Sequence, residues 1–176
     1  MVKWEDTPEH VQVSAWHDAY RNLDGAPLVG RTIRFDRHRV FVIVDWVMAH
    51  AKHDITVSYT LTGERLLELS NKSYGTAFER GNVAVRPLLQ ADQSLGIATT
   101  FHSPNYGVRE AANRLTITQT ASRTVFVSIV TVSEFTDGLM DIGDIACTVV
   151  NGVVTLDITR AGKSTNVQFE SPFPWV

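Results

Sequence analysis

Apolar and polar residues alternate with a period of two along much of this chain. Over residues 54–62, apolar side chains occupy every second position from Ile55 to Leu61, and hydroxyl-bearing residues fill the positions between them. Residues 114–118 repeat the pattern over a shorter span. Because successive side chains of a β-strand point to opposite faces, this pattern predicts strands with one buried face. No window of about a dozen residues shows the 3.6-residue period of an amphipathic helix.

Two runs, at residues 40–44 and 125–132, are instead almost continuously apolar and rich in β-branched residues. Such runs are typical of central strands that are covered on both faces. Asn151-Gly152 stands between two Val-Val pairs and predicts a type I′ hairpin turn, because both central positions of that turn need a positive φ. Further strands are expected at residues 11–16, 31–35, 66–69, 83–85, 96–101, 155–159 and 166–169, with a second hairpin turn at 160–164.

Many short strands separated by turn residues predict an all-β fold, an antiparallel sandwich or barrel with little or no helix. We predict a β-sandwich of the supersandwich type. The chain has 176 residues, of which 44% are hydrophobic and 20% charged, as in an ordinary globular protein. No internal repeat or linker divides it, so we expect a single domain over residues 1–176.

The net charge of −3 gives the chain no basic field. We therefore expect neither nucleic acid nor an anionic membrane as a partner. The only cysteine, Cys147, excludes an internal disulfide, and its apolar surroundings in the sequence favour a buried, inert thiol. The first residues lack the layout of a signal peptide, and no apolar run approaches transmembrane length.

Several motifs follow one another in a fixed order. They are Trp16-His17-Asp18-Ala19-Tyr20, Gly30-Arg31-Thr32-Ile33, a hydrophobic strand ending in Val44-Asp45, His53 at the start of the next strand, and Phe101-His-Ser-Pro-Asn-Tyr-Gly-Val-Arg-Glu110. In combination these motifs resemble the late part of heparinase II/III-like polysaccharide lyases. Two positions depart from the family's pattern: the family often has His where Gly30 stands, and a His-containing segment in place of Ser58-Tyr-Thr-Leu61.

The resemblance implies a fold, partners and a non-catalytic role for this chain within a larger protein. It corresponds to the carboxy-terminal β-sandwich region of a heparinase II/III-like protein, with no cofactor. The family's His-x-His-x-Asp segment and its catalytic α-helical toroid lie upstream of the part that this chain resembles. The leading hypothesis is therefore a domain, inactive alone, that shapes one wall of an acidic-polysaccharide cleft or stabilises the toroid of a periplasmic or secreted parent protein. An apolar face left uncovered would lead to self-association.

β-Elimination on a uronic acid unit needs a group that neutralises the carboxylate, a base and an acid. His102 and Tyr106 are the candidate catalytic residues, and Tyr106 and Arg109 are candidate substrate-binding residues, beside a turn at residues 103–107. We favour the simpler interpretation, a structural loop with an Arg109–Glu110 surface pair. An autonomous uronate-specific lyase acting through Tyr106 or His102 is the third hypothesis.

Two other clusters contain residue types that can act in catalysis or bind a metal. On a strand, Asp18 and Tyr20 share one face and His17 points to the other, so no compact triad is expected there. His50 and His53 have the spacing of metal ligands on a helix, but their segment connects two predicted strands. A solvated loop is therefore preferred to a metal site.

The chain has four tryptophans, Trp4, Trp16, Trp46 and Trp175. Because sugar faces pack on indole rings, they raise the second hypothesis, a free-standing carbohydrate-binding module. Trp46 is the best candidate, since the motifs place it at a strand end where a loop over residues 46–52 begins; the loop with Tyr106 and Arg109 would complete the surface. The other tryptophans are expected to fill a core or an interface, with Trp175 docking the tail.

Overall fold

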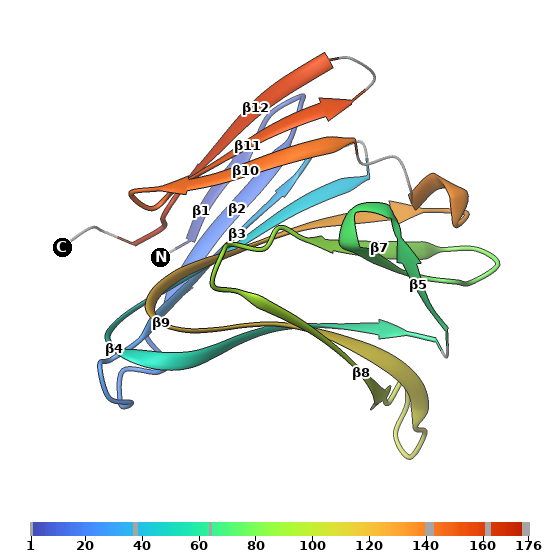
Figure 1. Cartoon of the computed structure of the whole chain (residues 1–176), viewed down its shortest axis with the longest axis horizontal. Helices are drawn as coiled ribbons and strands as arrows, with labels where there is room; N and C mark the ends of the chain where they lie inside the picture. The colour runs from blue at the N-terminus through green and yellow to red at the C-terminus, as the bar shows by residue number, and fades with distance from the viewer. Residues whose placement is uncertain (1, 37–38, 64, 140–142, 161–162, 174–176) are drawn as a thin grey trace.

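The computed structural model describes residues 2–36, 39–63, 65–139, 143–160 and 163–173. Antiparallel strands dominate, which confirms the predicted all-β fold (Figure 1). The strands are β1 (Val2–Asp6), β2 (Val11–His17), β3 (Leu28–Phe35), β4 (Val40–Thr62), β5 (Leu66–Leu69), β6 (Ser73–Thr76), β7 (Asn82–Pro87), β8 (Ser94–His102), β9 (Glu110–Ser133), β10 (Asp144–Val150), β11 (Val153–Arg160) and β12 (Lys163–Glu170), and two short 3-10 helices are η1 (Ser70–Lys72) and η2 (Asp137–Leu139). Within the described ranges, no helix is long and apolar enough to span a membrane.

The strands lie in three layers (Figure 1). The upper layer contains β10, β11 and β12, paired antiparallel in that order. A nine-stranded sheet forms the other two layers, because β4 and β9 bend together and pass from one to the other. The middle layer contains β1, β2, β3, the first half of β4, the second half of β9, β7, β6 and β5. The lower layer contains the second half of β4, the first half of β9, and β8.

β4 is one continuous strand of 23 residues. The sequence predicted two strands joined by a loop over residues 46–52, and that prediction is wrong. Pairing with β9 runs through Met48↔Arg123, shifts register, and resumes at His53↔Ala121. A bulge of this kind bends a strand while the ladder continues on both sides of it. The chain therefore passes between the middle and lower layers without a loop.

The predicted central strand and hairpins are present. The apolar run 125–132 lies in β9, where four successive residues from Phe126 are buried, as expected for a strand covered on both faces. Asn151 and Gly152 join β10 to β11 and have the predicted positive φ values, 49° and 74°. β11 and β12 also form the expected hairpin, although residues 161–162 of its turn lie outside the described part.

Two strands were not predicted from the sequence. β1 has five exposed residues, three of them charged, and β6 has four residues including a glycine. The alternation of apolar and charged residues in β1 covers only Val2 to Glu5, and β6 is too short to show a period of two. Both form because a neighbouring strand supplies the pairing edge: β2 for β1, and β5 and β7 for β6.

Two hydrophobic cores hold the layers together. The upper core, between the upper and middle layers, contains Val42, Val44, Trp46, Leu88, Val127, Ile129, Val154, Leu156, Phe169 and Phe173. The lower core, between the middle and lower layers, contains Leu61, Tyr74, Val85 and Leu115. Because full burial of a large apolar side chain contributes about 1.5–3 kcal/mol, the upper core is the stronger of the two contacts.

Candidate functional site

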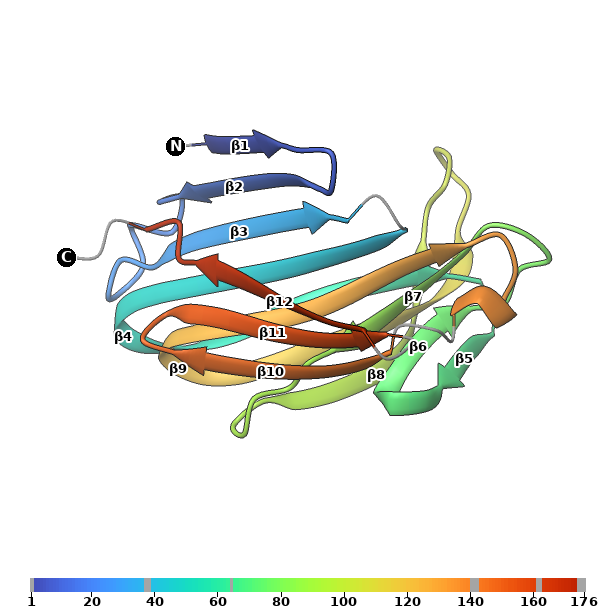
Figure 2. The same ribbon diagram turned by 90° about the horizontal axis from the view of Figure 1, so that it is seen from above.

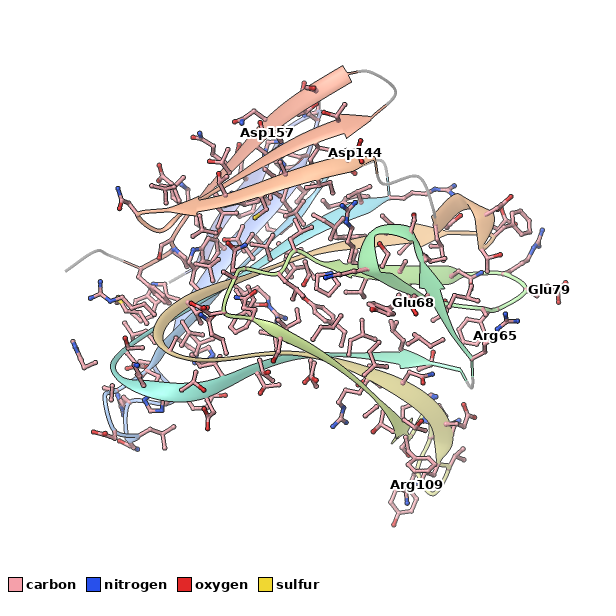
Figure 3. All side chains as sticks on the ribbon, viewed as in Figure 1. Arg65, Glu68, Glu79, Arg109, Asp144 and Asp157 are labelled. Atoms are coloured by element: carbon pink, nitrogen blue, oxygen red, sulfur yellow. The ribbon has the colours of Figure 1, made fainter. Side chains whose placement is uncertain are left out.

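The hairpin that joins β8 to β9 carries the candidate residues named from the sequence. Figure 3 shows Arg109 at the outer end of this hairpin. The Ser103 hydroxyl donates to the Val108 carbonyl at 2.6 Å, and the Val108 amide donates to the Asn105 carbonyl at 3.1 Å. Gly107 has a φ of 78°, where glycine avoids the strain of a side chain. The expected turn is therefore present and is closed by its own hydrogen bonds.

Arg109 forms a cation–π contact with Phe101. The centre of its guanidinium lies 3.8 Å from the ring centroid, and the Phe101 side chain is itself half-exposed. Such a contact contributes about 0.5–1 kcal/mol at an exposed site. It fixes an exposed positive charge at the end of the hairpin, beside an aromatic surface.

His102 and Glu110 are directly opposite each other on the β8–β9 ladder, and His102 Nε2 lies 3.2 Å from Glu110 Oε2. Glu110 therefore pairs across the ladder, while its neighbour Arg109, expected to be its partner, stacks on Phe101. Tyr106 is fully exposed at the hairpin turn. No protein surface encloses its hydroxyl, so the described structure holds His102 and Tyr106 in no closed acid–base site.

Trp46 lies in the interior of β4, so its expected position at a strand end is wrong. Its side chain is 2% exposed and belongs to the upper core. It borders a cavity of about 490 Å³ that Arg123, Asn151 and Phe173 also line. Because the core covers the ring, Trp46 offers no open indole face on which a sugar could stack.

The other tryptophans have different environments. Trp16 makes an edge-to-face contact with Phe173, with ring centroids 6.4 Å apart, and so helps to close the upper core. Trp4 is 64% exposed on β1, at the edge of the sheet, where it fills no core. Trp175 lies outside the described residues.

The segment after β2 turns instead of continuing as a strand. β2 ends at His17, and the Arg21 amide donates to the Asp18 carbonyl at 2.9 Å. The turn brings the rings of His17 and Tyr20 together, with centroids 5.7 Å apart. The expectation that these two side chains point to opposite faces is therefore wrong. Asp18 instead approaches Arg21, with 3.5 Å between charged atoms.

His50 and His53 belong to β4, so the solvated loop expected around them is wrong. His53 Nε2 is buried without a hydrogen-bond partner, and Asp54 accepts a 2.6 Å hydrogen bond from the Thr120 hydroxyl. In the part of the chain that the structure describes, no three potential metal-binding side chains cluster.

A polar cluster that sequence analysis did not identify joins β3 to β4. Arg31 Nε donates to Asp45 Oδ1 at 2.5 Å, and Arg31 Nη2 donates to Asp45 Oδ2 at 3.0 Å. Asp45 is 5% exposed, and burial raises the pKa of its carboxyl, while the guanidinium opposes that shift. The bond to Asp45 raises the pKa of Arg31. Both residues occur in the motifs, but only the β3–β4 register places them opposite each other.

This ion pair borders a pocket of about 360 Å³ at the bend of β4, lined also by Tyr20, His53 and Asp54. The Arg31 charge is neutralised by Asp45, and Asp54 adds a negative charge. The pocket therefore has no net positive charge with which to attract an acidic ligand. The exposed cation of Arg109 is the better candidate for that contact.

The fold of this chain is similar to that of solved structures over nearly its whole length. A heparinase III matches with a TM-score of 0.78 and 15% sequence identity, covering 97% of this chain and 27% of that one. Heparan sulfate lyase HepC from Pedobacter heparinus matches with a TM-score of 0.75 and 17% identity, covering 96% of this chain and 27% of that one. This chain thus spans 27% of the length of these proteins. No protein-family model matches it, and no curated protein matches its sequence significantly.

The matches include nearly the whole chain, so all three layers belong to the shared architecture. At 15–17% identity the likeness is one of fold. It agrees with the resemblance drawn from the motifs, which is confirmed at that level. The chain has the β-sandwich fold of one part of the heparinase III structures.

Proposed function

We propose that this chain is the β-sandwich part of an acidic-polysaccharide lyase of the heparinase III type, and that it contacts the polysaccharide without cleaving it. The observation that carries the proposal is the fold match, with a TM-score of 0.78 over 97% of the chain. One of the similar proteins is, by its name, a lyase of heparan sulfate, an acidic polysaccharide. The role at the wall of a polysaccharide cleft follows from that likeness and from the hairpin described above.

The geometry of the hairpin supports a binding role over a catalytic one. General acid–base catalysis requires groups held within hydrogen-bond reach of the reacting atoms in a defined site. His102 is engaged by Glu110, and Tyr106 extends into solvent. Neither side chain is positioned by a surrounding cleft, so we expect the chain alone to be inactive.

Arg109 supplies the chemistry that an acidic polysaccharide would recognise. Guanidinium groups form charge-assisted hydrogen bonds with carboxylates and sulfates, and apolar sugar faces pack on aromatic rings. The hairpin combines both, because Arg109 is stacked on half-exposed Phe101 and the turn carries fully exposed Tyr106. In a chain with a net charge of −3, a local cation of this kind is needed to hold an anion.

Calorimetric titration with heparan sulfate oligosaccharides tests this contact. Replacing Arg109 with Gln should weaken binding about tenfold, equivalent to about 1.4 kcal/mol. Arg80→Gln is the matched control, since Arg80 is also exposed, lies 5.8 Å from the Phe135 ring centroid and pairs with Glu134. We expect the control to bind within about twofold of the wild type. Equal losses in both variants, or no binding by the wild type, would contradict the proposed contact.

Incubation of the chain with uronate-rich glycans tests the catalytic alternative. We expect no unsaturated product that absorbs in the ultraviolet. Formation of such a product, lost in His102→Ala or Tyr106→Phe, would establish an autonomous lyase instead.

The second candidate is a free-standing carbohydrate-binding module, which the full exposure of Tyr106 and the half-exposure of Phe101 on the same hairpin favour. Such a module would bind uncharged oligosaccharides by stacking. Tyr106→Ala would then weaken binding more than Arg109→Gln. For the acidic-polysaccharide contact we expect the reverse order.

A further inference from the structure

β8 is an edge strand of the lower layer. Its nine residues pair with β9 on one side, and on the other side no strand of the described structure pairs with it. Figure 2 places β8 on the side of the molecule opposite β1. An open edge presents a row of unpaired backbone donors and acceptors, which form a template for a further strand.

β8 also lacks the residues that keep sheet edges from pairing. It contains no Lys, Arg, Asp, Glu or Pro, and His102 at its end is the one titratable residue in it. Each of the other edge strands contains at least one charged residue: Lys3, Glu5 and Asp6 in β1, Asp54 in the second half of β4, Glu68 in β5, Asp144 in β10, and Glu170 in β12. Figure 3 shows two of these, Glu68 and Asp144. Charged residues on an edge strand oppose edge-to-edge association, so β8 is the unprotected edge among the described strands.

The face of β8 that packs toward the lower core is incompletely covered. Ile97 is 47% exposed and Phe101 is 50% exposed. Their ladder partners on β9 are Leu115 and Ala111. Two large apolar side chains on one strand therefore remain half in water beside an open edge. A strand added at that edge would cover both.

A second copy of β8 complements this edge. A two-fold axis perpendicular to the sheet keeps the faces of both copies aligned, so opposite residues must have numbers of the same parity. Centring the axis on Ala98 pairs all nine residues, from Ser94 with the second copy's His102 onward. Leu95 then faces the second copy's Phe101. Ile97 reaches the same ring diagonally, at a spacing within the range of large side chains.

No like charges lie opposite each other on the two β8 strands, because the His102–Glu110 pairs and the Arg109 cations lie at opposite ends of the interface. Arg114, the ladder partner of Ala98, lies on β9, one strand back from the axis in each copy. We propose that two copies of this chain associate through β8, antiparallel about a two-fold axis at Ala98, to extend the lower layer into a continuous six-stranded sheet. One strand pair buries little surface, so the dimer is weak and forms reversibly. This inference does not rest on the proposed polysaccharide contact, and because both interactions use the Phe101 side chain, they would compete for it.

Disulfide trapping tests the register. Ala98→Cys places two thiols opposite each other, with Cα atoms about 4.5–5.5 Å apart, within the range that a disulfide can bridge. Thr100→Cys is the matched control on the same face, because the two copies of that position would lie about 14 Å apart. Both are made in a Cys147→Ala background. Cys147 is half-buried, and burial raises the pKa of its thiol, so it should react slowly. Its removal ensures that any cross-link forms through the introduced cysteine.

We expect mild oxidation to convert most of the Ala98→Cys protein to a covalent dimer and to leave the Thr100→Cys protein monomeric. Cross-linking of both variants to the same extent, or of Thr100→Cys alone, would overturn the Ala98 register. Circular dichroism of the reduced proteins checks that both substitutions leave the fold intact.

Sedimentation equilibrium tests the interface without a cross-link. The wild-type chain should shift from monomer to dimer over loading concentrations from about 1 µM to about 1 mM. Ala98→Lys puts two like charges opposite each other and should raise the dissociation constant at least about tenfold. Thr56→Lys adds the same charge to the same outer face on β4, away from the β8 edge, and should leave association unchanged. A wild-type monomer throughout, or equal weakening by both lysines, would overturn the proposal.

Discussion

The two halves of β4 have different sequence patterns, because the first half is covered on both faces and the second half on one. In the first half, which lies in the middle layer, Val44–Val47 are buried at four successive positions, because the upper and lower layers cover both faces. In the second half, which lies in the lower layer, partly buried and exposed residues alternate from His53 to Thr60. One strand therefore carries both patterns, and the change occurs at the bend.

The upper and lower cores differ in the same way. Ten buried apolar residues seal the upper core, whereas four form the lower core, which shares its interlayer space with the Arg31–Asp45 ion pair. Ile97 and Phe101 at the edge of the lower layer remain half-exposed. We infer that the upper core supplies most of the stability, and that the lower layer is the part with surface left for contacts.

The largest effect is expected from Trp46→Ala, which empties a buried site in the upper core. Loss of a buried tryptophan costs about 3–5 kcal/mol of unfolding free energy, measured by urea denaturation. Trp4→Ala is the control, since Trp4 is 64% exposed, and should cost less than about 0.5 kcal/mol. Similar costs for both would mean that the upper core is not the main source of stability.

Arg31→Leu should have the next largest effect, because it leaves the Asp45 carboxylate buried without its partner. We expect a loss of about 2–4 kcal/mol, below the full cost for a buried pair since Arg31 is half-exposed. The double variant Arg31→Leu/Asp45→Leu should recover a large part of that loss in the same denaturation experiment. A double variant less stable than Arg31→Leu would show that the ion pair itself stabilises the lower layer.

The pH dependence of the unfolding free energy should contain a contribution from the Asp45 carboxyl. Burial holds its pKa above the ordinary value in the folded state, so the folded chain retains this proton to higher pH than the unfolded chain does. The contribution of Asp45 to stability therefore grows as the pH falls from its folded pKa to its unfolded pKa, and declines as the pH rises through that window. The stability of the wild type relative to Asp45→Asn, from urea midpoints at several pH values, should increase on acidification. A relative stability that decreases would contradict the direction of the shift.

The smallest effect is expected at the edge of the lower layer. Phe101→Ala should destabilise the monomer by about 0.5–1.5 kcal/mol, because the ring is half-exposed and its main specific contact is with Arg109. Thermal unfolding at low protein concentration, where the chain is monomeric, provides the measurement. A loss comparable with that of Trp46→Ala would remove the distinction between the two cores.

Local patterns in the sequence determined the parts of the fold that depend on neighbours along the chain. Alternation marked the second half of β4, and the continuous apolar run marked the second half of β9. Asn151-Gly152 fixed a turn because few other residues adopt two successive positive φ values. The ordered motifs also led to the heparinase fold, which the structural likeness confirms.

Only the tertiary structure decided which side chains meet. Pairing of β4 with β3 and β9 continues through Trp46 to Met48, which places Trp46 in the core and not in the expected loop. Cross-strand register paired His102 with Glu110 and Arg31 with Asp45, and the hairpin turn placed Arg109 on Phe101. The physical reason is that side-chain period and turn chemistry are local properties, whereas strand register and the layer that covers a face are set by residues distant in the chain.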